Sequence, residues 1–262
     1  MTDLTRFALD LAAAARAETL PRWADVDDAA NKAGEGDYDP VTQADVEAER
    51  AMRAMIEVRY PRHGIVGEEF GTKPPQGPHS WSLDPVDGTR AFVCGLPSWT
   101  TLIALLEDGV PILGIVDAPR MHELYLGDGQ TTRLITASGE RALRSSGCER
   151  LAEARLSTTD PYLFAGAERD VFEQLRAAAR LTRYGLDAYA YARLAAGSLD
   201  LVVESGLKSW DYQALIPVVR GAGGIVGNWR GGEDFSTGQI VAAATPALFE
   251  QAVRLTEKST AP

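Results

Sequence analysis

The chain has 262 residues, of which 45% are hydrophobic and 24% are charged, as is typical of a globular protein and not of a disordered one. Asp and Glu number 37 against 26 Lys and Arg, which gives a formal net charge of −11 at pH 7. So acidic a surface repels phosphate backbones and anionic lipids. This excludes nucleic acid and membranes as principal partners.

Two cysteines, Cys94 and Cys148, are too few for a disulfide framework and match no zinc-site spacing. They predict free thiols in a reducing compartment. No apolar run resembles a signal peptide or reaches the length of a membrane helix. We therefore expect a soluble, cytoplasmic protein.

The first half of the chain mixes helices with short strands. Apolar residues at helical spacing predict a helix over residues 4–19, which Pro21 ends. Residues 29–39 predict a loop, and Thr42 with Asp45 predicts a capping box that opens a helix over 43–59. Asp108-Gly109 predicts a tight hairpin. The other expected elements are strands at 63–67, 81–83, 100–107, 110–117, 123–126 and 131–135 and a short helix at 90–93.

From about residue 150, strands and helices alternate. Strands are predicted at 155–158, 181–184, 199–204, 224–229 and 240–243, and helices at 167–180, 188–196, 210–220 and from Pro246. Pro217 is expected to kink its helix. Tyr189 and Tyr191 are expected to be packing residues. The pattern predicts a layered α/β (α+β) protein of two packed halves, 1–145 and 146–262.

The segment from Asp84 to Thr89 carries the strongest chemical signal. Its sequence Asp-Pro-Val-Asp-Gly-Thr places two carboxylates three residues apart, directly after an apolar strand. Carboxylate and carbonyl oxygens without His or Cys suit a hard cation such as Mg2+. Gly88 and Thr89 present backbone N–H groups at the start of a short helix, which favours phosphate binding. Taken alone, the hexapeptide is better explained by ordinary turn chemistry than by a metal site.

Further acids lie at the ends of predicted elements. Glu68 and Glu69 follow a buried strand, and Asp211 opens a helix. Alone, each has a structural explanation: a solvated strand end for Glu68 and Glu69, and a first-turn helix acid for Asp211. Asp45 alone is the third residue of a capped helix.

Taken together and in order, these segments resemble the inositol monophosphatase family of lithium-sensitive, Mg2+-dependent phosphatases. The matching segments are residues 39–45, 67–69, 81–89 and 210–211, followed by the glycine-rich 221–224. The resemblance spans roughly residues 5–250. It implies an αβαβα sandwich, a homodimer and hydrolysis of a small phosphorylated alcohol. Lys32 is the candidate for a basic residue that family members carry ahead of the first segment, although the loop that follows it is longer than usual.

The resemblance also implies roles for individual residues. One metal ion is held by Glu68, Asp84 and the Val86 carbonyl. A second is held by Asp84, Asp87 and Asp211. A third, more weakly bound ion is coordinated by Glu68 and water. The ions are expected to be Mg2+, with Mn2+ as the alternative. Thr89, polarised by Asp45, orients the metal-activated water with the help of Glu68. Gly88 and Thr89 bind phosphate, and Glu69 supports the site. Most ligands then lie in the first half, and Asp211 lies in the second with the substrate-selecting segment.

The segments 184–191, 201–208 and 210–217 resemble the histidinol-phosphate phosphatase branch of the family. Gly185, Asp187 and Glu204 are the substrate-binding candidates, because carboxylates pair with the ammonium and imidazole groups of histidinol. The implied reaction is hydrolysis of histidinol phosphate in histidine biosynthesis.

Several alternatives remain open. Asp187 can instead cap the helix that it precedes. The substrate can be inositol 1-phosphate or a range of sugar phosphates, and the chain can be a regulatory, protein-binding member of the family. A nucleotide substrate is disfavoured, because no basic or aromatic pocket is evident. Serine-triad and P-loop mechanisms are excluded by the lack of their motifs.

Overall fold

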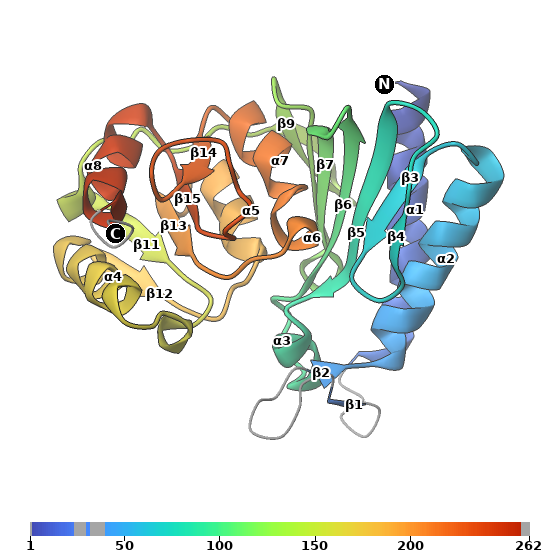
Figure 1. Ribbon diagram of the computed structural model, residues 1–262, viewed down its shortest axis with the longest axis horizontal. Coiled ribbons are helices and arrows are strands. Elements are labelled where there is room, and N and C mark those ends of the chain that lie inside the picture. The colour runs from blue at the N-terminus through green and yellow to red at the C-terminus, as the bar shows by residue number, and fades with distance from the viewer. Residues whose placement is uncertain (1, 24–29, 32–39, 258–262) are drawn as a thin grey trace.

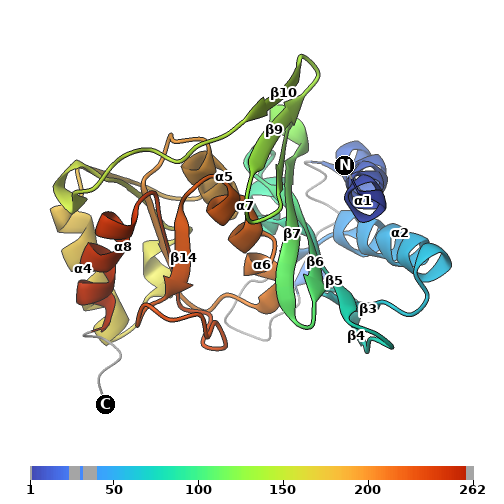
Figure 2. The same ribbon diagram turned by 90° about the horizontal axis from the view of Figure 1, so that it is seen from above.

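The computed structural model describes residues 2–23, 30–31 and 40–257. Two β-sheets lie between three layers of helices, which makes an αβαβα sandwich (Figures 1 and 2). Helices α1 and α2 form one outer layer, α5, α6 and α7 the middle layer, and α4 and α8 the other outer layer. The expected layered α/β fold is confirmed.

The helices are α1 (Asp3–Thr19), α2 (Gln43–Arg59), α3 (Thr89–Val93), α4 (Ala167–Ala178), α5 (Tyr189–Ala195), α6 (Ser209–Tyr212), α7 (Leu215–Gly221) and α8 (Pro246–Thr256). The larger sheet has the order β10-β9-β8-β7-β6-β5-β3-β4. Its strands are β3 (Gly64–Gly67), β4 (Gly71–Lys73), β5 (His79–Asp87), β6 (Thr100–Glu107), β7 (Val110–Ala118), β8 (Glu123–Gly127), β9 (Thr132–Thr136) and β10 (Gly139–Ala142). All its neighbours pair antiparallel except β3 and β5, which are parallel.

The smaller sheet has the order β12-β11-β13-β15-β14. Its strands are β11 (Arg155–Ser157), β12 (Leu181–Arg183), β13 (Leu201–Glu204), β14 (Ile225–Asn228) and β15 (Ile240–Ala243). Strand β11 pairs parallel with β12 and with β13, as the alternation of strands and helices in this half requires. A separate two-stranded ribbon joins β1 (Ala30–Asn31) to β2 (Pro40–Val41).

The larger sheet is buried on both faces. Along β6, Ile103 and Leu105 pack towards α1 and α2, whereas Leu102 and Ala104 pack towards α5 and α7. Successive residues of a strand point to opposite faces, so a continuous apolar run is what a doubly covered strand needs. The middle helices are thereby held between the two sheets.

The helix expected over residues 210–220 is in fact two helices. Gln213 and Ala214, between α6 and α7, keep right-handed helical φ and ψ angles, but the run of helical hydrogen bonds is interrupted there, and Pro217 lies in the first turn of α7. Pro217 lacks the N–H group that would donate to the Gln213 carbonyl four residues earlier, and this is where the helical hydrogen bonding is interrupted. The expected disturbance by Pro217 is therefore present, as a break between two helices. Strands β4 and β10 were not predicted, and β5 is longer than predicted.

Other local predictions are confirmed. Asp108 and Gly109 have φ angles of 50° and 82°, and they join β6 to β7 in a tight hairpin. Thr42 and Asp45 form the capping box of α2. Cys94 and Cys148 are free thiols. Among the described residues, no helix is both long enough and apolar enough to cross a membrane.

The larger sheet ends at Ala142 and the smaller one begins at Arg155. The division into halves at residues 145 and 146 stays a prediction. Lys32, Asp39 and most of the predicted loop over 29–39 lie outside the described residues.

Candidate functional site

A β-bulge brings Asp84 and Asp87 to one side of the larger sheet. Two residues three apart on a regular strand would face opposite sides. The pairing of β5 with β6 shifts between Asp84 and Asp87, so Pro85 and Val86 leave the regular ladder. Proline, which lacks an N–H group, fits such a bulge. Asp84 Oδ1 accepts a hydrogen bond from Val86 N at 3.1 Å, and Thr101 Oγ1 donates to the Pro85 carbonyl at 2.7 Å.

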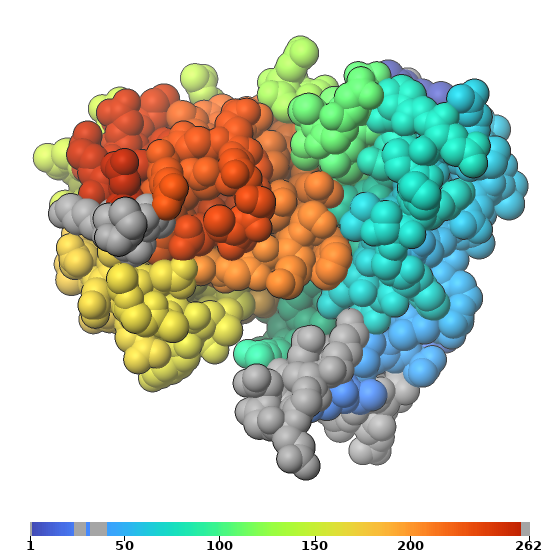
Figure 3. All heavy atoms as spheres, viewed as in Figure 1, coloured from blue at the N-terminus to red at the C-terminus, as the bar shows by residue number. Residues whose placement is uncertain are grey.

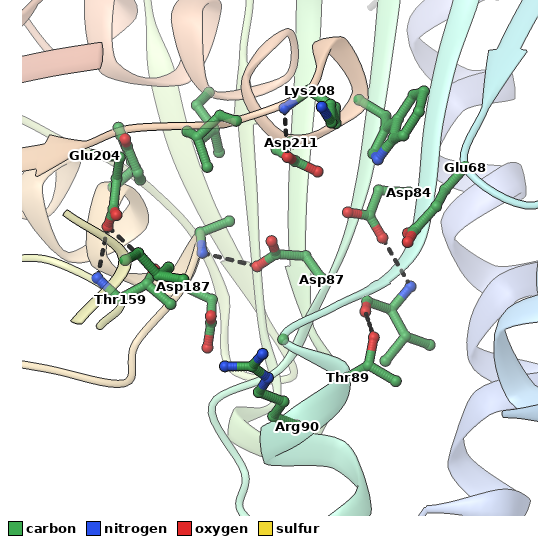
Figure 4. A pocket seen from close by; sticks show the side chains of 18 residues that line it. Glu68, Asp84, Asp87, Thr89, Arg90, Thr159, Asp187, Glu204, Lys208 and Asp211 are labelled. Carbon is green, nitrogen blue, oxygen red and sulfur yellow. Dashed lines mark hydrogen bonds between the residues drawn. The ribbon is translucent and has the colours of Figure 1, made fainter. Parts of the chain in front are cut away.

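Glu68 reaches the same place from the neighbouring strand. Strands β3 and β5 are parallel, with Gly67 opposite Leu83, so Glu68 and Asp84 follow at the same edge of the sheet. Glu68 N donates to the Leu83 carbonyl at 3.3 Å. Figure 4 shows the Glu68 and Asp84 carboxylates on the same side of the cavity.

The side chain of Glu49 on α2 holds the backbone that follows Glu68 in place. Its buried carboxylate accepts hydrogen bonds from Glu69 N at 2.7 Å and Phe70 N at 3.2 Å, and from Arg53 Nε at 2.6 Å. A Cβ atom at Gly67 would lie 2.1 Å from Glu49 Oε1, so only glycine fits there. Sequence analysis missed Glu49. Its partner segment lies about twenty positions away, and no local pattern connects the two.

The second half of the chain closes the site. Asp211 lies in the first turn of α6, and its Oδ2 accepts from Lys208 N at 2.7 Å. Asp87 Oδ2 accepts from Ala188 N, at the start of α5, at 2.7 Å and from Thr100 Oγ1 at 3.3 Å. The acidic side chain at the N-terminus of α5 is therefore Asp87, which belongs to the first half of the chain, whereas α5 belongs to the second.

These acids line one cavity of about 360 Å³. Glu68, Asp84, Asp87 and Asp211 lie at one end of it, and Asp187 and Glu204 at the other (Figure 4). Burial, followed by repulsion from Glu68 and Asp87, raises the pKa of Asp84 well above its ordinary value. Burial, followed by repulsion from Asp187, does the same to the pKa of Asp87. Carboxylates that repel one another in this way are stabilised by a cation placed among them.

Each carboxylate is turned to its own N–H donor: Asp84 to Val86, Asp87 to Ala188, and Asp211 to Lys208. Within the described part of the chain, no three Asp, Glu, His or Cys side chains are already arranged to hold a metal ion. The donor chemistry fits Mg2+, because every ligand offered is an oxygen.

The structure does not show Thr89 bonded to Asp45. Thr89 Oγ1 donates to the Val86 carbonyl at 3.0 Å. Asp45 Oδ2 accepts from Thr42 N at 2.9 Å and Thr42 Oγ1 at 2.6 Å, and Asp45 Oδ1 is buried without a hydrogen-bond partner among the described residues. Burial raises the pKa of Asp45 to about 7, with Glu69 and Glu68 adding to the rise. The predicted polarisation of Thr89 by Asp45 stays a prediction.

Asp187 does not cap the helix that follows it, because α5 has no side-chain cap. Its φ of 47° is left-handed, and its Oδ2 lies where a Cβ on Gly88 would approach to 3.0 Å. Burial raises the pKa of Asp187 to about 6, against the opposing effect of Arg90. Burial raises the pKa of Glu204 to about 8. Gly185 lies outside this cavity, in the wall of the next one.

A second cavity, of about 800 Å³, shares Arg90, Thr159 and Asp187 with the first. Figure 3 shows a notch at this face, between the yellow segment that holds α4 and the teal segment that holds α3. Its other lining residues include Arg169, Arg176, Tyr162, Tyr184 and Leu96. A cavity lined by arginines and tyrosines is therefore present, although the acids Asp160, Glu173 and Asp187 line it as well. That no pocket suits a nucleotide stays a prediction. The arginines and tyrosines come from segments far apart in the sequence, so no local cluster revealed them.

A family model described as the inositol monophosphatase family matches residues 1–261. The chain belongs to this family. The family assignment made from the motifs is confirmed, and so is the expectation of an enzyme that hydrolyses phosphomonoesters.

The relatives of this chain differ in the activity for which each is named. A bifunctional phosphatase from Arabidopsis thaliana is 44% identical over 198 residues, 74% of this chain and 56% of the relative, so the match spans little over half of that protein. A histidinol-phosphatase from Chlorobaculum parvum is 32% identical over 212 residues, 81% of each chain. A solved structure of an inositol monophosphatase from Zymomonas mobilis is 39% identical with a TM-score of 0.84, over 97% of this chain and 98% of that one.

Proposed function

We propose that the protein is a Mg2+-dependent phosphomonoesterase that hydrolyses histidinol phosphate to histidinol and phosphate. The observation that carries the proposal is the placement of acids at both ends of one cavity (Figure 4). Four of them form a set of hard oxygen ligands at one end. Two more are available at the other end for a cationic alcohol.

The metal end is proposed to work as follows. Glu68, Asp84 and the Val86 carbonyl hold one ion; Asp84, Asp87 and Asp211 hold a second; Glu68 contributes to a weaker third. When bound, the ions supply charge neutralisation for the phosphate and a lowered pKa for the water that attacks it. Thr89 and Gly88 line the cavity beside these ligands, where Thr89 orients the water and the two backbone N–H groups bind phosphate oxygens. Glu69 supports Glu68.

The alcohol end favours a cation. Asp187 and Glu204 both have raised pKa values, about 6 and about 8, because burial penalises their charged forms. An ammonium or imidazolium group beside them restores the charged forms and forms charge-assisted hydrogen bonds. Histidinol phosphate carries both groups, whereas inositol is neutral. The left-handed backbone of Asp187 is a strained conformation of the kind that functional sites retain.

Inositol 1-phosphate is the second candidate substrate. The solved structure that is 39% identical to this chain is that of an inositol monophosphatase, which favours inositol 1-phosphate as a substrate. Glu204 suits either substrate. It already accepts hydrogen bonds from Thr158 Oγ1 at 3.0 Å and from Thr159 N at 2.7 Å, so it also has a structural task.

The deciding experiment compares kcat/KM for L-histidinol phosphate, myo-inositol 1-phosphate and glycerol 2-phosphate in the wild type and in Asp187→Ala. The variant should lose about tenfold or more on histidinol phosphate and far less on glycerol 2-phosphate, because only the first offers a cation to Asp187. Asp160→Ala is the matched control, since Asp160 lines the neighbouring cavity and caps a 3-10 turn. A wild-type preference for inositol phosphate, or equal losses on the two esters, would refute the histidinol assignment.

The proposal includes a homodimer. Leu96, Tyr162 and Tyr184 are 52%, 85% and 41% exposed around the second cavity, and such apolar surface favours association. Light scattering at working concentration tests it: a mass of twice 28.2 kDa is expected, and a monomer would contradict it. A role in histidine biosynthesis, lithium sensitivity and a cytoplasmic location stay predictions.

A further inference from the structure

One residue that lines the carboxylate cavity carries a hydroxyl group with no hydrogen-bond partner among the described residues. Tyr191 of α5 lines the cavity and is 2% exposed. Its phenolic oxygen is buried and has no hydrogen-bond partner among the described residues. Buried tyrosine hydroxyls are nearly always paired, because an unpaired one costs stability. The packing role expected from the sequence leaves this hydroxyl unexplained.

The acids around Tyr191 do not need its hydrogen bond. Glu204 accepts from Thr159 and a neighbouring threonine, and Asp87 accepts from the start of α5. Asp211 accepts from the backbone ahead of α6. Burial and the charges of Glu204, Asp87 and Asp211 raise the pKa of Tyr191 well above its ordinary value. The phenol therefore keeps its proton and remains a donor.

Tyr191 lines the cavity together with acids of both its ends, Asp87 and Asp211 at the metal end and Glu204 at the alcohol end. The charges of these three acids all contribute to the raised pKa of Tyr191. Figure 4 shows Asp87 between Asp84 on one side and Glu204 on the other. When a phosphomonoester spans the cavity, the oxygen that joins phosphorus to the alcohol lies between the two ends.

We propose that Tyr191 donates a hydrogen bond to the oxygen that leaves with the alcohol, an inference that rests on the proposed function. As the P–O bond breaks, its electron pair passes to that oxygen. The attacking water gives its hydroxyl to phosphorus and, through solvent, its proton to the alcohol. Tyr191 keeps its own proton throughout. Its hydrogen bond strengthens as charge develops on the leaving oxygen, so it stabilises the transition state more than the bound substrate.

The test removes the hydroxyl alone, with Tyr191→Phe, and varies the leaving group. Glycerol 2-phosphate releases an alkoxide that needs stabilisation, whereas 4-nitrophenyl phosphate releases a phenolate that spreads its charge into the ring. Neither alcohol carries an ammonium group, so the comparison does not depend on histidinol recognition. Tyr189→Phe is the matched control: it lies on the same helix, and its hydroxyl donates to Glu123 at 2.9 Å outside the cavity.

Tyr191→Phe should lower kcat for glycerol 2-phosphate by about tenfold or more, as expected for loss of one donor aimed at the transition state, and change kcat for 4-nitrophenyl phosphate by less than about twofold. Its melting temperature should equal or exceed that of the wild type, because the hydroxyl has no partner to lose. Tyr189→Phe should melt lower, because its hydrogen bond is lost.

Equal losses on the two esters, or no loss on either, would refute the role of Tyr191, as would a melting temperature that falls as far as that of Tyr189→Phe. The proposed function fails separately. A wild type that prefers inositol phosphate to histidinol phosphate overturns only the substrate, and a wild type that hydrolyses no phosphomonoester overturns both proposals.

Discussion

At the scale of residues, the site depends on side chains whose tasks are set by distant neighbours. The bulge at Pro85 and Val86 turns Asp84 and Asp87 to one side, and Thr101 on the next strand holds it. In a similar way, the Glu49 side chain on α2 holds the backbone next to Glu68 by accepting a hydrogen bond from Glu69 N. The acids can therefore lie close together despite their repulsion, because each is anchored through backbone hydrogen bonds.

Replacement of Glu49 should loosen Glu68. In Glu49→Ala the N–H groups of Glu69 and Phe70 lose their acceptor and Arg53 loses its charge partner, which should lower the free energy of unfolding by about 2–4 kcal/mol. Glu49→Gln keeps one acceptor and the volume, and should lose less. Urea denaturation measures both variants.

The Glu49→Gln variant should also need about tenfold more Mg2+ for half-maximal activity, since residues that orient ligands affect metal affinity by that order. Glu47→Gln is its control, because Glu47 on the same helix pairs with Arg50 at the surface. An unchanged Mg2+ requirement in Glu49→Gln would mean that Glu49 has only a structural role.

The candidate ligands could be named from the sequence because several segments, between residues 39 and 211, match in order the pattern of a known family. Glu68, Asp84, Asp87 and Asp211 do line one cavity. Glu49 and Tyr191 could not be named from the sequence. Glu49 contacts a segment about twenty residues away, and Tyr191 stands out only because its hydroxyl has no hydrogen-bond partner among the described residues. Such facts appear only in three dimensions.

At the scale of elements, long periodic segments were predictable and short exposed ones were not. Helices α1 and α2 and the hairpin of β6 and β7 carry strong local signals. Strand β10 is exposed along its whole length, so neither alternation nor an apolar run marks it. The break between α6 and α7 lies four residues before Pro217, which cannot donate a hydrogen bond to the Gln213 carbonyl, so it does have a local sequence signal.

Gly114 controls how closely α7 approaches this sheet. A Cβ atom there would lie 2.0 Å from the Ala214 carbonyl, just before α7. Gly114→Ala should therefore push α6 and α7 outward, lower the free energy of unfolding by about 1–3 kcal/mol, and weaken Mg2+ activation through Asp211. Thermal denaturation and Mg2+ titration of activity check both. Gly77→Ala, which meets no atom within 4 Å, is the control; an identical effect in both variants would refute the packing account.

At the scale of the whole molecule, the site belongs to neither half alone. The first half supplies Glu68, Asp84 and Asp87, and the second supplies Asp187, Glu204 and Asp211. The hydrogen bond from Ala188 N to Asp87 joins the halves within the site itself. The layers were predictable from element order and the family resemblance. This contact was not, because it joins residues 101 positions apart.

The buried acids make stability depend on pH. The pKa values of Asp187, Asp45 and Glu204 are raised to about 6, 7 and 8. Each folded carboxyl then holds a proton that the unfolded chain has lost, so the free energy of unfolding should fall as pH rises from about 5 to 8. The lowered pKa of His63 by itself would make the free energy of unfolding rise with pH. The three carboxyls with raised pKa values outweigh this single histidine.

Urea denaturation across this pH range, with chelator present, measures the slope. Glu204→Gln should flatten it, because the raised pKa of Glu204 then no longer contributes. A free energy of unfolding that rises steadily from pH 5 to pH 8 would contradict the raised pKa values.

The central claim is that the carboxylate cavity binds Mg2+, and calorimetric titration of the protein with Mg2+ near neutral pH tests it most directly. We expect saturable binding that releases protons, because carboxyls with raised pKa values must ionise to become ligands. Titration in two buffers with different heats of ionisation measures that release. Asp87→Asn should remain folded and bind fewer Mg2+ ions, because the second ion loses one of its proposed ligands. It should also lose more than about a hundredfold in phosphate release, since bound metal supplies several kcal/mol of stabilisation. Saturable binding unchanged in Asp87→Asn, or no binding to the wild type at millimolar Mg2+, would contradict the account.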